Sequence, residues 1–427
     1  MSKLLCVLAG LAVVWGLSRA LQQAKPREGF DFVTYYAAGK LATSSESAAV
    51  YHRVAGDESK IPLDGVLFRE AYEAGVPWCG QYYNLPICLL LFKPLALLRF
   101  EHAYRLVTAL NLASLLLTAW MAVQAAAPRA TPVGRWIGFA CLSVVACSSH
   151  PVLYNARIGN LSPLLALACV VAWVWDSRGH TVLAGTALGL SIIFKPSPLP
   201  LLLYFALRRR WPTVVSTLVT VAALLAIGLA YYGVAMHMRW YELIAYYADR
   251  TFVAWNNQSL SAGLLRLTVR AEEIVAWEVI AEPLWVIGLE RLSVLTGFAW
   301  WLACFRRWST SQGAAMGYAA GLLLVNIASP FAWTHYYVVA IWPIAILAGE
   351  LWHGERRGAG RLALLALSVV TWAADPMALF EFARNWRLLP PVGPLARGLV
   401  VSNTLATAVL GFIWLQRRRP PRETHGG

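Results

Sequence analysis

The sequence predicts an all-α polytopic membrane protein, folded as a single domain over residues 1–427, with about twelve transmembrane helices. Of the 427 residues, 59% are hydrophobic and only 14% are charged, and the mean hydropathy is +0.55. A soluble domain carries about 25% charged residues. Apolar runs close to the length of a membrane span recur along the chain, and basic clusters lie between alternate runs. This is the pattern of membrane helices joined by cytoplasmic loops.

A helix needs roughly 20 apolar residues to cross the hydrocarbon core. We expect crossings near residues 4–20, 103–126, 133–149, 161–177, 181–194, 197–207, 211–232, 284–305, 312–328, 335–351, 361–375 and 393–415. An even number of crossings puts both termini on one side. The first run follows Lys3, as in a signal peptide, but it lacks a clean small-x-small cleavage site, so we expect a retained span.

The positive charges predict the orientation. The basic clusters are Arg129/Arg135, Arg178, Arg208/Arg209/Arg210, Arg306/Arg307, Arg356/Arg357/Arg361 and Arg417/Arg418/Arg419. The loops and termini on this side hold +12 of the net charge of +14. A basic chain can bind nucleic acid, but short loops rich in Lys and Arg remain cytoplasmic. We therefore expect a multi-pass protein of the cell (inner or plasma) membrane with both termini in the cytoplasm. Its surroundings are membrane lipids, with no nucleic-acid partner.

Two large loops are expected on the outer face, at about 21–102 and 233–283. The first contains the apolar run 85–99, which is about 15 residues long and includes Lys93 and Pro94. Counting this run as a crossing would turn every later arginine cluster outward. We therefore expect it on or partly within the outer surface.

Asp31 is the first polar residue of interest in these outer segments. It lies in Gly29–Tyr36, where aromatic residues flank it. Such surroundings raise the pKa of a carboxyl group and favour a role as general base. The alternative is that Asp31 is the N-cap of a helix beginning at Phe32, and the two roles are compatible.

Lys195 lies between two short apolar runs, 181–194 and 197–207. These runs reach only about 21 and 16 Å, less than the ~30 Å hydrocarbon core, so their apex should lie below the outer surface. Pro196 and Pro198 suit the start of a returning helix, whose positive end would face Lys195. This arrangement predicts an anion site for a lipid phosphate. The alternative is a lysine that extends to the outer interface.

Three further groups of polar residues fall on the outer face. Arg157, in the expected loop 150–160, can hold a phosphate or carboxylate, or is an ordinary loop arginine. His335 can donate to a sugar hydroxyl or a phosphate, and nearby Trp333 offers a stacking face, although Trp and Tyr at membrane edges are commonly interfacial anchors. The amides of 256–258, with Arg266 downstream, suit a hydroxyl-rich ligand or form a capped turn.

Several other chemistries are missing from the sequence. There is no Walker-type or dinucleotide-binding glycine loop, no His/Cys cluster with zinc spacing, and no Asp-x-Asp pair in the outer loops. We therefore expect no metal or cofactor. An activated donor that already contains a phosphate ester would supply the energy.

Taken in order, these features resemble the GT-C membrane glycosyltransferases, and within them glycosyltransferase family 87, the polyprenyl-phosphate-mannose-dependent mannosyltransferases. The resemblance rests on residues 31–39, Gly159-Asn160-Leu161-Ser162, Ala184-Gly185 to Lys195-Pro196, Asn257-Gln258-Ser259-Leu260, and Ser329-Pro330 through His335-Tyr336. The chain departs from the family pattern at Asn160-Leu161-Ser162 (family Gln-x-Asn) and Asn84-Leu85-Pro86 (family Pro-Pro after Tyr).

The resemblance implies a GT-C fold and inverting transfer of a sugar, mannose in this family, from a polyprenyl-phosphate donor to a lipid-linked or glycan acceptor outside the cytoplasm. It places Asp31 at the position of the catalytic base. The substrate-binding residues that we expect are Tyr35, Arg157, Asn160, Lys195, Asn257, Gln258, Arg266, His335 and Tyr336.

Two other classes of protein are alternatives. A lipid or solute transporter or flippase would also use twelve spans and an embedded lysine, but transporters often contain repeats. We find no repeat, and the polar residues gather on one face. An inactive scaffold is the third alternative, and only an assay distinguishes it.

Overall fold

The computed structural model describes residues 2–51, 65–305, 308, 310–353, 359–385 and 401–417. In these residues the helices are α1 (Ser2–Gln23), α2 (Phe30–Leu41), α3 (Val66–Glu73), α4 (Ile87–Ala96), α5 (Phe100–Ala126), α6 (Pro132–Ser148), α7 (His150–Ile158), α8 (Ser162–Ser177), α9 (Thr181–Phe194), α10 (Leu201–Leu207), α11 (Trp211–Tyr246), α12 (Leu260–Leu265), α13 (Ala271–Ala276), α14 (Leu284–Ala303), α15 (Ser311–Ile327), α16 (Ile341–His353), α17 (Ala359–Ala373), α18 (Pro376–Asn385) and α20 (Asn403–Arg417). Shorter 3-10 helices are η1 (Pro26–Glu28), η2 (Ser47–Tyr51) and η4 (Thr334–Ala340). The strands β1 (Arg250–Phe252) and β2 (Val279–Ala281) pair antiparallel.

The chain is an all-α polytopic membrane protein. Of the described helices, five are long and apolar enough to cross a membrane: α1, α5, α11, α14 and the unit formed by η4 and α16. Two bent pairs, α6 with α7 (60°) and α17 with α18 (92°), raise this number to seven if each is one span. Shorter apolar helices occupy other expected crossings, among them α8, α9, α15 and α20. The expected count of twelve is not confirmed by this criterion and stays a prediction.

The spanning helices differ in what surrounds them. Only 11% of the most apolar part of α1 and of α14 is buried, against 89% for the unit of η4 and α16. Leucine and valine side chains such as Leu295 and Val219 are more than half exposed. Apolar side chains belong on this surface when the solvent is lipid, because the acyl chains are themselves apolar, and the helical backbone satisfies its own hydrogen bonds there.

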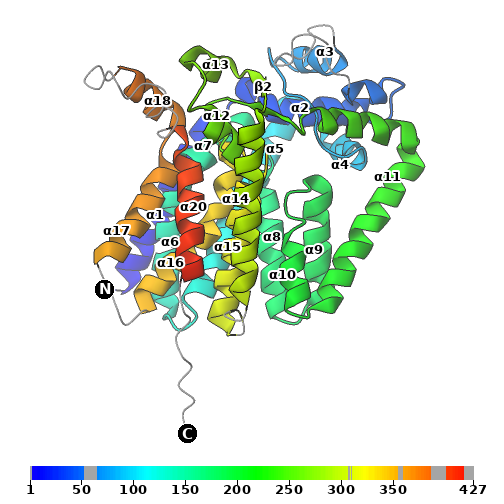
Figure 1. Cartoon of the computed structure of the whole chain (residues 1–427). Coiled ribbons are helices and arrows are strands. Elements are labelled where there is room, and N and C mark those ends of the chain that lie inside the picture. Colours follow the sequence, from blue (N-terminus) through cyan, green and yellow to red (C-terminus); the bar gives the residue numbers. More distant parts are fainter. Residues whose placement is uncertain are drawn as a thin grey trace.

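A smaller layer covers one end of the helical bundle. In Figure 1 the helices α2, α3, α4 and α13 lie across this end, while α1 begins and α20 ends toward the opposite end. The covering layer has its own apolar core, in which Phe32 of α2 packs against Phe100 and Tyr104 of α5. The run expected on the outer surface forms α4, whose ten residues reach about 15 Å and cannot span a bilayer.

Helix α11 bends where it reaches this layer. Gly233 has φ 72° and ψ 173°, a backbone conformation that is open to glycine and costly for other residues. The expected crossing ends at residue 232, and the helix continues past the bend to Tyr246 (Figure 1). The second part carries Trp240 and Tyr241 to the wall of the cavity described below.

One expectation about the chain is wrong, and another concerns residues that the structure does not describe. The segment expected as loop 150–160 is mostly the helix α7, which begins with Pro151 in its first turn and ends at Gly159. Proline suits the first turn of a helix, and glycine its end. The arginines at 306–307, 356–357 and 418–419 lie outside the described residues.

Candidate active site

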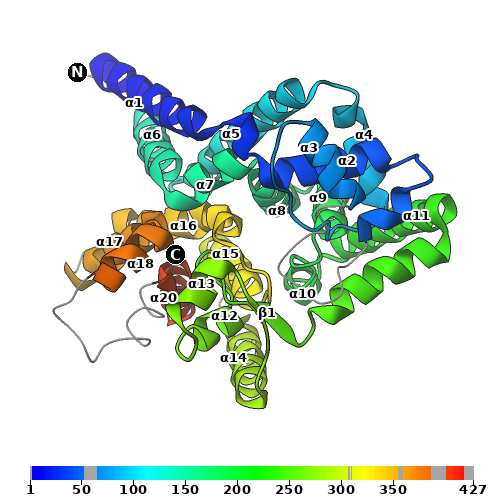
Figure 2. The same cartoon turned by 90° about the horizontal axis from the view of Figure 1, so that it is seen from above.

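A cavity of about 730 Å³ lies between the helical bundle and the covering layer. Seen from above in Figure 2, α2, α3 and α4 cover one part of the bundle, and α12 and α13 cover another. Residues from both groups of outer segments line the cavity, together with the apex after α9 and the turn before η4. Six of the expected site residues meet here: Asp31, Tyr35, Asn160, Lys195, His335 and Tyr336.

Asp31 is the second residue of α2 and faces this cavity. Gly29 takes the N-cap position and the helix begins at Phe30, so the expectation of Asp31 as the cap of a helix starting at Phe32 is wrong. Its Oδ2 accepts a hydrogen bond of 2.7 Å from Nδ2 of Asn160. Burial raises the pKa of Asp31 to about 6, while the Asn160 hydrogen bond and the charge of Lys195 act in the opposite direction.

Asn160 is held in one orientation by its neighbours. Its Oδ1 accepts hydrogen bonds from the backbone N–H (3.0 Å) and the hydroxyl (2.7 Å) of Ser162. Its Nδ2 therefore points the other way, toward Asp31 and the Tyr35 hydroxyl at 3.0 Å. Such a network assigns the oxygen and nitrogen of an amide. The carboxylate of Asp31 thus receives a donor whose direction is set before any substrate binds.

Gly159 explains how Asn160 comes so close to α2. It ends α7 with φ 72°, and a Cβ at this position would lie 2.6 Å from Cβ of Phe32. Real Cβ atoms do not approach other atoms this closely, so the position needs glycine for its φ and for its space. The close contact between α7 and α2 depends on both properties.

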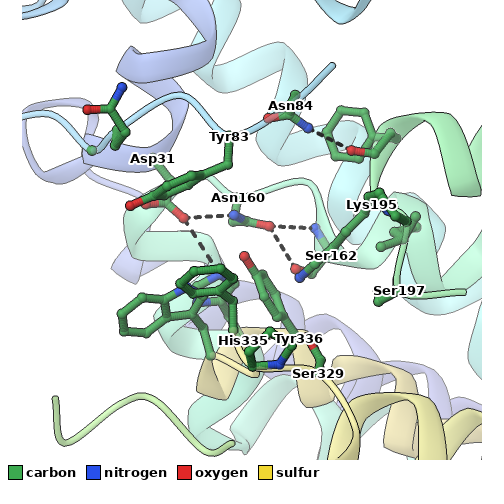
Figure 3. Close-up of a pocket in the computed structure, with 18 of the residues that line it drawn as sticks. Asp31, Tyr83, Asn84, Asn160, Ser162, Lys195, Ser197, Ser329, His335 and Tyr336 are labelled. Carbon is green, nitrogen blue, oxygen red and sulfur yellow. Dashed lines mark hydrogen bonds and ion pairs between the residues drawn. The ribbon is translucent and has the colours of Figure 1, made fainter. Parts of the chain in front are cut away.

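Lys195 caps the C-terminal end of α9, where a cation is favourable. Its Nζ lies over the ring of Tyr336, and Figure 3 shows it on the far side of Asn160 from Asp31. No described carboxylate lies within ion-pair distance of this ammonium group. The expected returning helix is shorter than predicted, since α10 has seven residues and begins only at Leu201. Pro196 and Pro198 therefore precede this helix instead of beginning it, and the expectation that its positive end faces Lys195 stays a prediction.

His335 enters the cavity from η4. The turn before it is fixed to the other outer loop, because the backbone N–H of Thr334 donates to the carbonyl of Asn256 at 2.8 Å. His335 is 3% exposed, and its Nε2 lies 3.6 Å from Oδ2 of Asp31. Neither of its ring nitrogens has a hydrogen-bond partner among the described residues, nor has Oδ1 of buried Asn256. Buried polar atoms are normally paired, so this wall has free capacity for a ligand (Figure 3).

Four expected site residues lie outside the cavity wall. Arg157 forms an ion pair with Glu28, and its side chain is 54% exposed. Arg266 is fully buried and donates to the carbonyls of Ala254 and Asn257 and to the hydroxyl of Ser402. These contacts engage both arginines within the protein, although Nε of Arg266 has no hydrogen-bond partner among the described residues. Their expected contacts with substrate stay predictions.

The two amides of the same loop are also engaged within the protein. Nδ2 of Asn257 donates to the carbonyl of Phe252 at 2.9 Å, and Nε2 of Gln258 donates to that of Val401 at 2.7 Å. Both side chains are fully buried. They correspond to the capped turn left open as an alternative, and their expected binding roles stay predictions.

The cavity also contains residues that the sequence analysis did not single out. These are Trp78 and Trp277, and the cavity wall also includes Tyr154 from the segment 150–160 and Asn256 from the expected amide group 256–258. The available signal for Trp78 was a tryptophan far from the ends of the expected spans, whereas Trp277 lies close to the expected crossing 284–305. As for metals, no three His, Cys, Asp or Glu side chains of the described residues lie together as a metal site would require. The expectation of a reaction without a cofactor stays a prediction.

Comparison with known proteins identifies a matching family and two relatives of this chain. Residues 82–330 match the model of glycosyltransferase family 87. The chain is 28% identical over 346 residues to a polyprenol-phosphate-mannose-dependent alpha-(1-2)-phosphatidylinositol mannoside mannosyltransferase of Mycobacterium tuberculosis, covering 76% of this chain and 75% of the relative. A protein of the same name from Mycolicibacterium smegmatis is 25% identical over 359 residues, covering 78% and 76%. The family match includes Asn160 and Lys195, spans more than half of the sequence, and shows that the chain belongs to glycosyltransferase family 87.

Proposed function

We propose that this glycosyltransferase moves mannose, with inversion, from a polyprenyl-phosphate donor to a lipid-linked acceptor that carries a sugar. The observation that carries the proposal is one cavity holding the Asp31 carboxylate, oriented by Asn160, with the Lys195 ammonium group across from it. The names of the mycobacterial relatives support polyprenyl-phosphate mannose as the donor and a glycolipid as the acceptor.

The reaction follows from where the charges lie. Asp31 accepts the proton of an acceptor hydroxyl while that oxygen forms a bond to the anomeric carbon of the donor. The bond between the anomeric carbon and the phosphate oxygen breaks on the opposite face, and polyprenyl phosphate leaves with the electron pair. Lys195 stabilises the negative charge that develops on this leaving group. Attack and departure on opposite faces invert the configuration.

A small pocket beside Lys195 suits the phosphate. It measures about 40 Å³, and its polar lining comes from Lys195, Ser162, Ser197 and Asn326. The Lys195 ammonium group, the Ser197 hydroxyl and the Asn326 amide are suitable donors for a phosphate ester, whereas the Ser162 hydroxyl already donates to Asn160. Its apolar members belong to the buried core of the bundle: Leu201, Leu322, Val325 and Val339.

The direction in which the cavity opens follows from the positive charges. Helix α8 begins beside Asn160 and ends 16 residues later, about 24 Å away. Arg178 caps that far end, and Arg210 pairs there with Asp176. Arginine-rich ends remain in the cytoplasm, which supports an extracytoplasmic active site and the GT-C arrangement implied by the family.

The test is a transfer assay with purified protein in lipid nanodiscs. A panel of polyprenyl-phosphate sugars is combined with mannose-bearing membrane lipids, and Asp31→Asn is assayed beside the wild type. We expect transfer with mannose as the donor sugar and a loss of at least about a hundredfold in the variant, the range for a general base. Undiminished transfer by Asp31→Asn would exclude Asp31 as the base. Movement of lipid across the bilayer without transfer would favour the transporter alternative.

A further inference from the structure

Three tryptophans form a rim on the part of the cavity near Asp31. Trp277 and Trp333 stack with ring centroids 5.5 Å apart and an interplanar angle of 27°, and Trp78 meets Trp277 edge-on at 5.9 Å. All three line the cavity. They come from the first outer loop, the end of α13 and the turn before η4. The fold therefore brings together one indole from each of three separate outer segments.

The backbone at Trp277 is in an unusual conformation. This residue ends α13 with φ 59° and ψ 39°, the left-handed region that bulky residues rarely adopt. Glycine or asparagine would take this position without strain. A tryptophan here costs stability, and such strain is commonly found where a side chain is positioned for function.

Unused hydrogen-bonding groups lie beside the rim. Oδ1 of Asn256 and both ring nitrogens of His335 are buried and have no hydrogen-bond partner among the described residues. Asn256 is 1% exposed and His335 is 3% exposed, and both line the cavity. Apolar faces next to an acceptor and a donor of hydrogen bonds match a pyranose ring, which offers C–H bonds on its face and hydroxyls at its edge.

The position of the rim relative to Asp31 determines which sugar it holds. Ring contacts lead from Trp78 to Phe30, the neighbour of Asp31, at 4.6 Å. Lys195 instead contacts Tyr336 and lies on the other side of Asn160 (Figure 3). In an inverting displacement the attacking hydroxyl and the leaving phosphate occupy opposite faces of the anomeric carbon. The side of Asp31 away from Lys195 is therefore the acceptor side.

We infer that Trp78, Trp277 and Trp333, with Asn256 and His335, form the subsite for the sugar ring of the acceptor. This inference rests on the proposed function and extends it, because the function itself does not say how the acceptor is recognised. The subsite selects acceptors that carry a pyranose next to the reacting hydroxyl, in preference to lipids without sugar. Trp78, which is 41% exposed, forms the outer edge through which such a headgroup enters.

The experiment measures binding without catalysis. Octyl α-D-mannopyranoside is titrated onto the full chain in nanodiscs, and the dissociation constant is obtained by saturation-transfer NMR. Octanol serves as the probe without sugar. Trp277→Leu keeps an apolar side chain and removes the aromatic face, whereas Trp277→Phe keeps a ring. Trp255→Leu is the matched control, because Trp255 packs against Trp277 but does not belong to the cavity wall.

We expect Trp277→Leu to weaken mannoside binding about threefold to tenfold, the range of an aromatic stacking contact. Trp277→Phe should lie in between, and Trp255→Leu should bind as the wild type does. If Trp277→Leu does not fold, Trp78→Leu at the exposed edge decides the question. The subsite is refuted if the wild type binds the mannoside no better than octanol, or if the rim variants bind it as well as the wild type. Mannoside binding without transfer would refute the proposed function alone.

Discussion

Nδ2 of Asn160 donates a 2.7 Å hydrogen bond to Oδ2 of Asp31, joining two residues 129 positions apart in the chain. This bond connects the first outer helix to the junction between α7 and α8. It fixes the direction of one carboxylate oxygen, while Oδ1 accepts no hydrogen bond from the described residues. The free oxygen is thus the one available to a substrate hydroxyl.

The first prediction concerns pH. Asp31 has a pKa raised to about 6, because burial opposes its charge. Only the ionised carboxylate accepts a proton, so kcat/KM should rise tenfold per pH unit below 6 and level off above it. The measurement is a pH profile of transfer at low acceptor concentration. A profile without an acid limb near pH 6 would contradict the role of Asp31.

The second prediction concerns Asn160. Replacing it with alanine removes the hydrogen bond that lowers the pKa of Asp31, so the acid limb should move to higher pH. We also expect kcat to fall about tenfold to a hundredfold, since a correctly oriented base is lost. A purely structural role would lower the rate without moving the limb, so the profile separates the two explanations. Thermal unfolding of the variant serves as the control.

The third prediction compares two cations. Lys195→Met keeps the length of the side chain and removes its charge, and it should weaken donor binding about tenfold to a hundredfold, as expected for a hydrogen bond to a charged group. Arg157→Met removes a charge that pairs with Glu28 outside the cavity, and it should change donor affinity less than about threefold. Binding of polyprenyl phosphate to each variant is the measurement. An equal loss of affinity in the two variants would indicate that Arg157 also binds the donor.

The fourth prediction concerns Gly159. Gly159→Ala must adopt φ 72° and place a Cβ 2.6 Å from Phe32, so we expect lower thermal stability and a loss of transfer as Asn160 is displaced. Gly179 is the matched control, since its φ is 85° and nothing lies within 4 Å of its Cβ position. Gly179→Ala should cost only the backbone strain, about 1 kcal/mol. If both variants behave alike, the close contact with α2 does not matter.

The predicted and observed helix bounds agree best where a continuous apolar run determines the helix. Helix α9 has the bounds 181–194 that its apolar run predicts, and α8 and α15 begin and end within a residue of their expected crossings. The prediction from the sequence was wrong where contacts with other elements determine the secondary structure. Residues 150–158 are polar enough to read as a loop, yet form α7 because tertiary packing buries most of them.

By itself, the sequence determined that this chain is a helical membrane protein, and its motifs pointed to the glycosyltransferase family to which it belongs. The class and the family both follow from local composition and the order of residues, and the amino-acid sequence contains this information directly. Only the tertiary structure decided which polar residues meet. It brought Asn160 to Asp31 and paired Arg157 with Glu28. It buried Arg266 among backbone carbonyls and gathered three tryptophans from distant segments. Apart from the short-range bonds of Arg266, these contacts join residues far apart in the chain, and their geometry is set by packing, about which residue type and spacing carry little information.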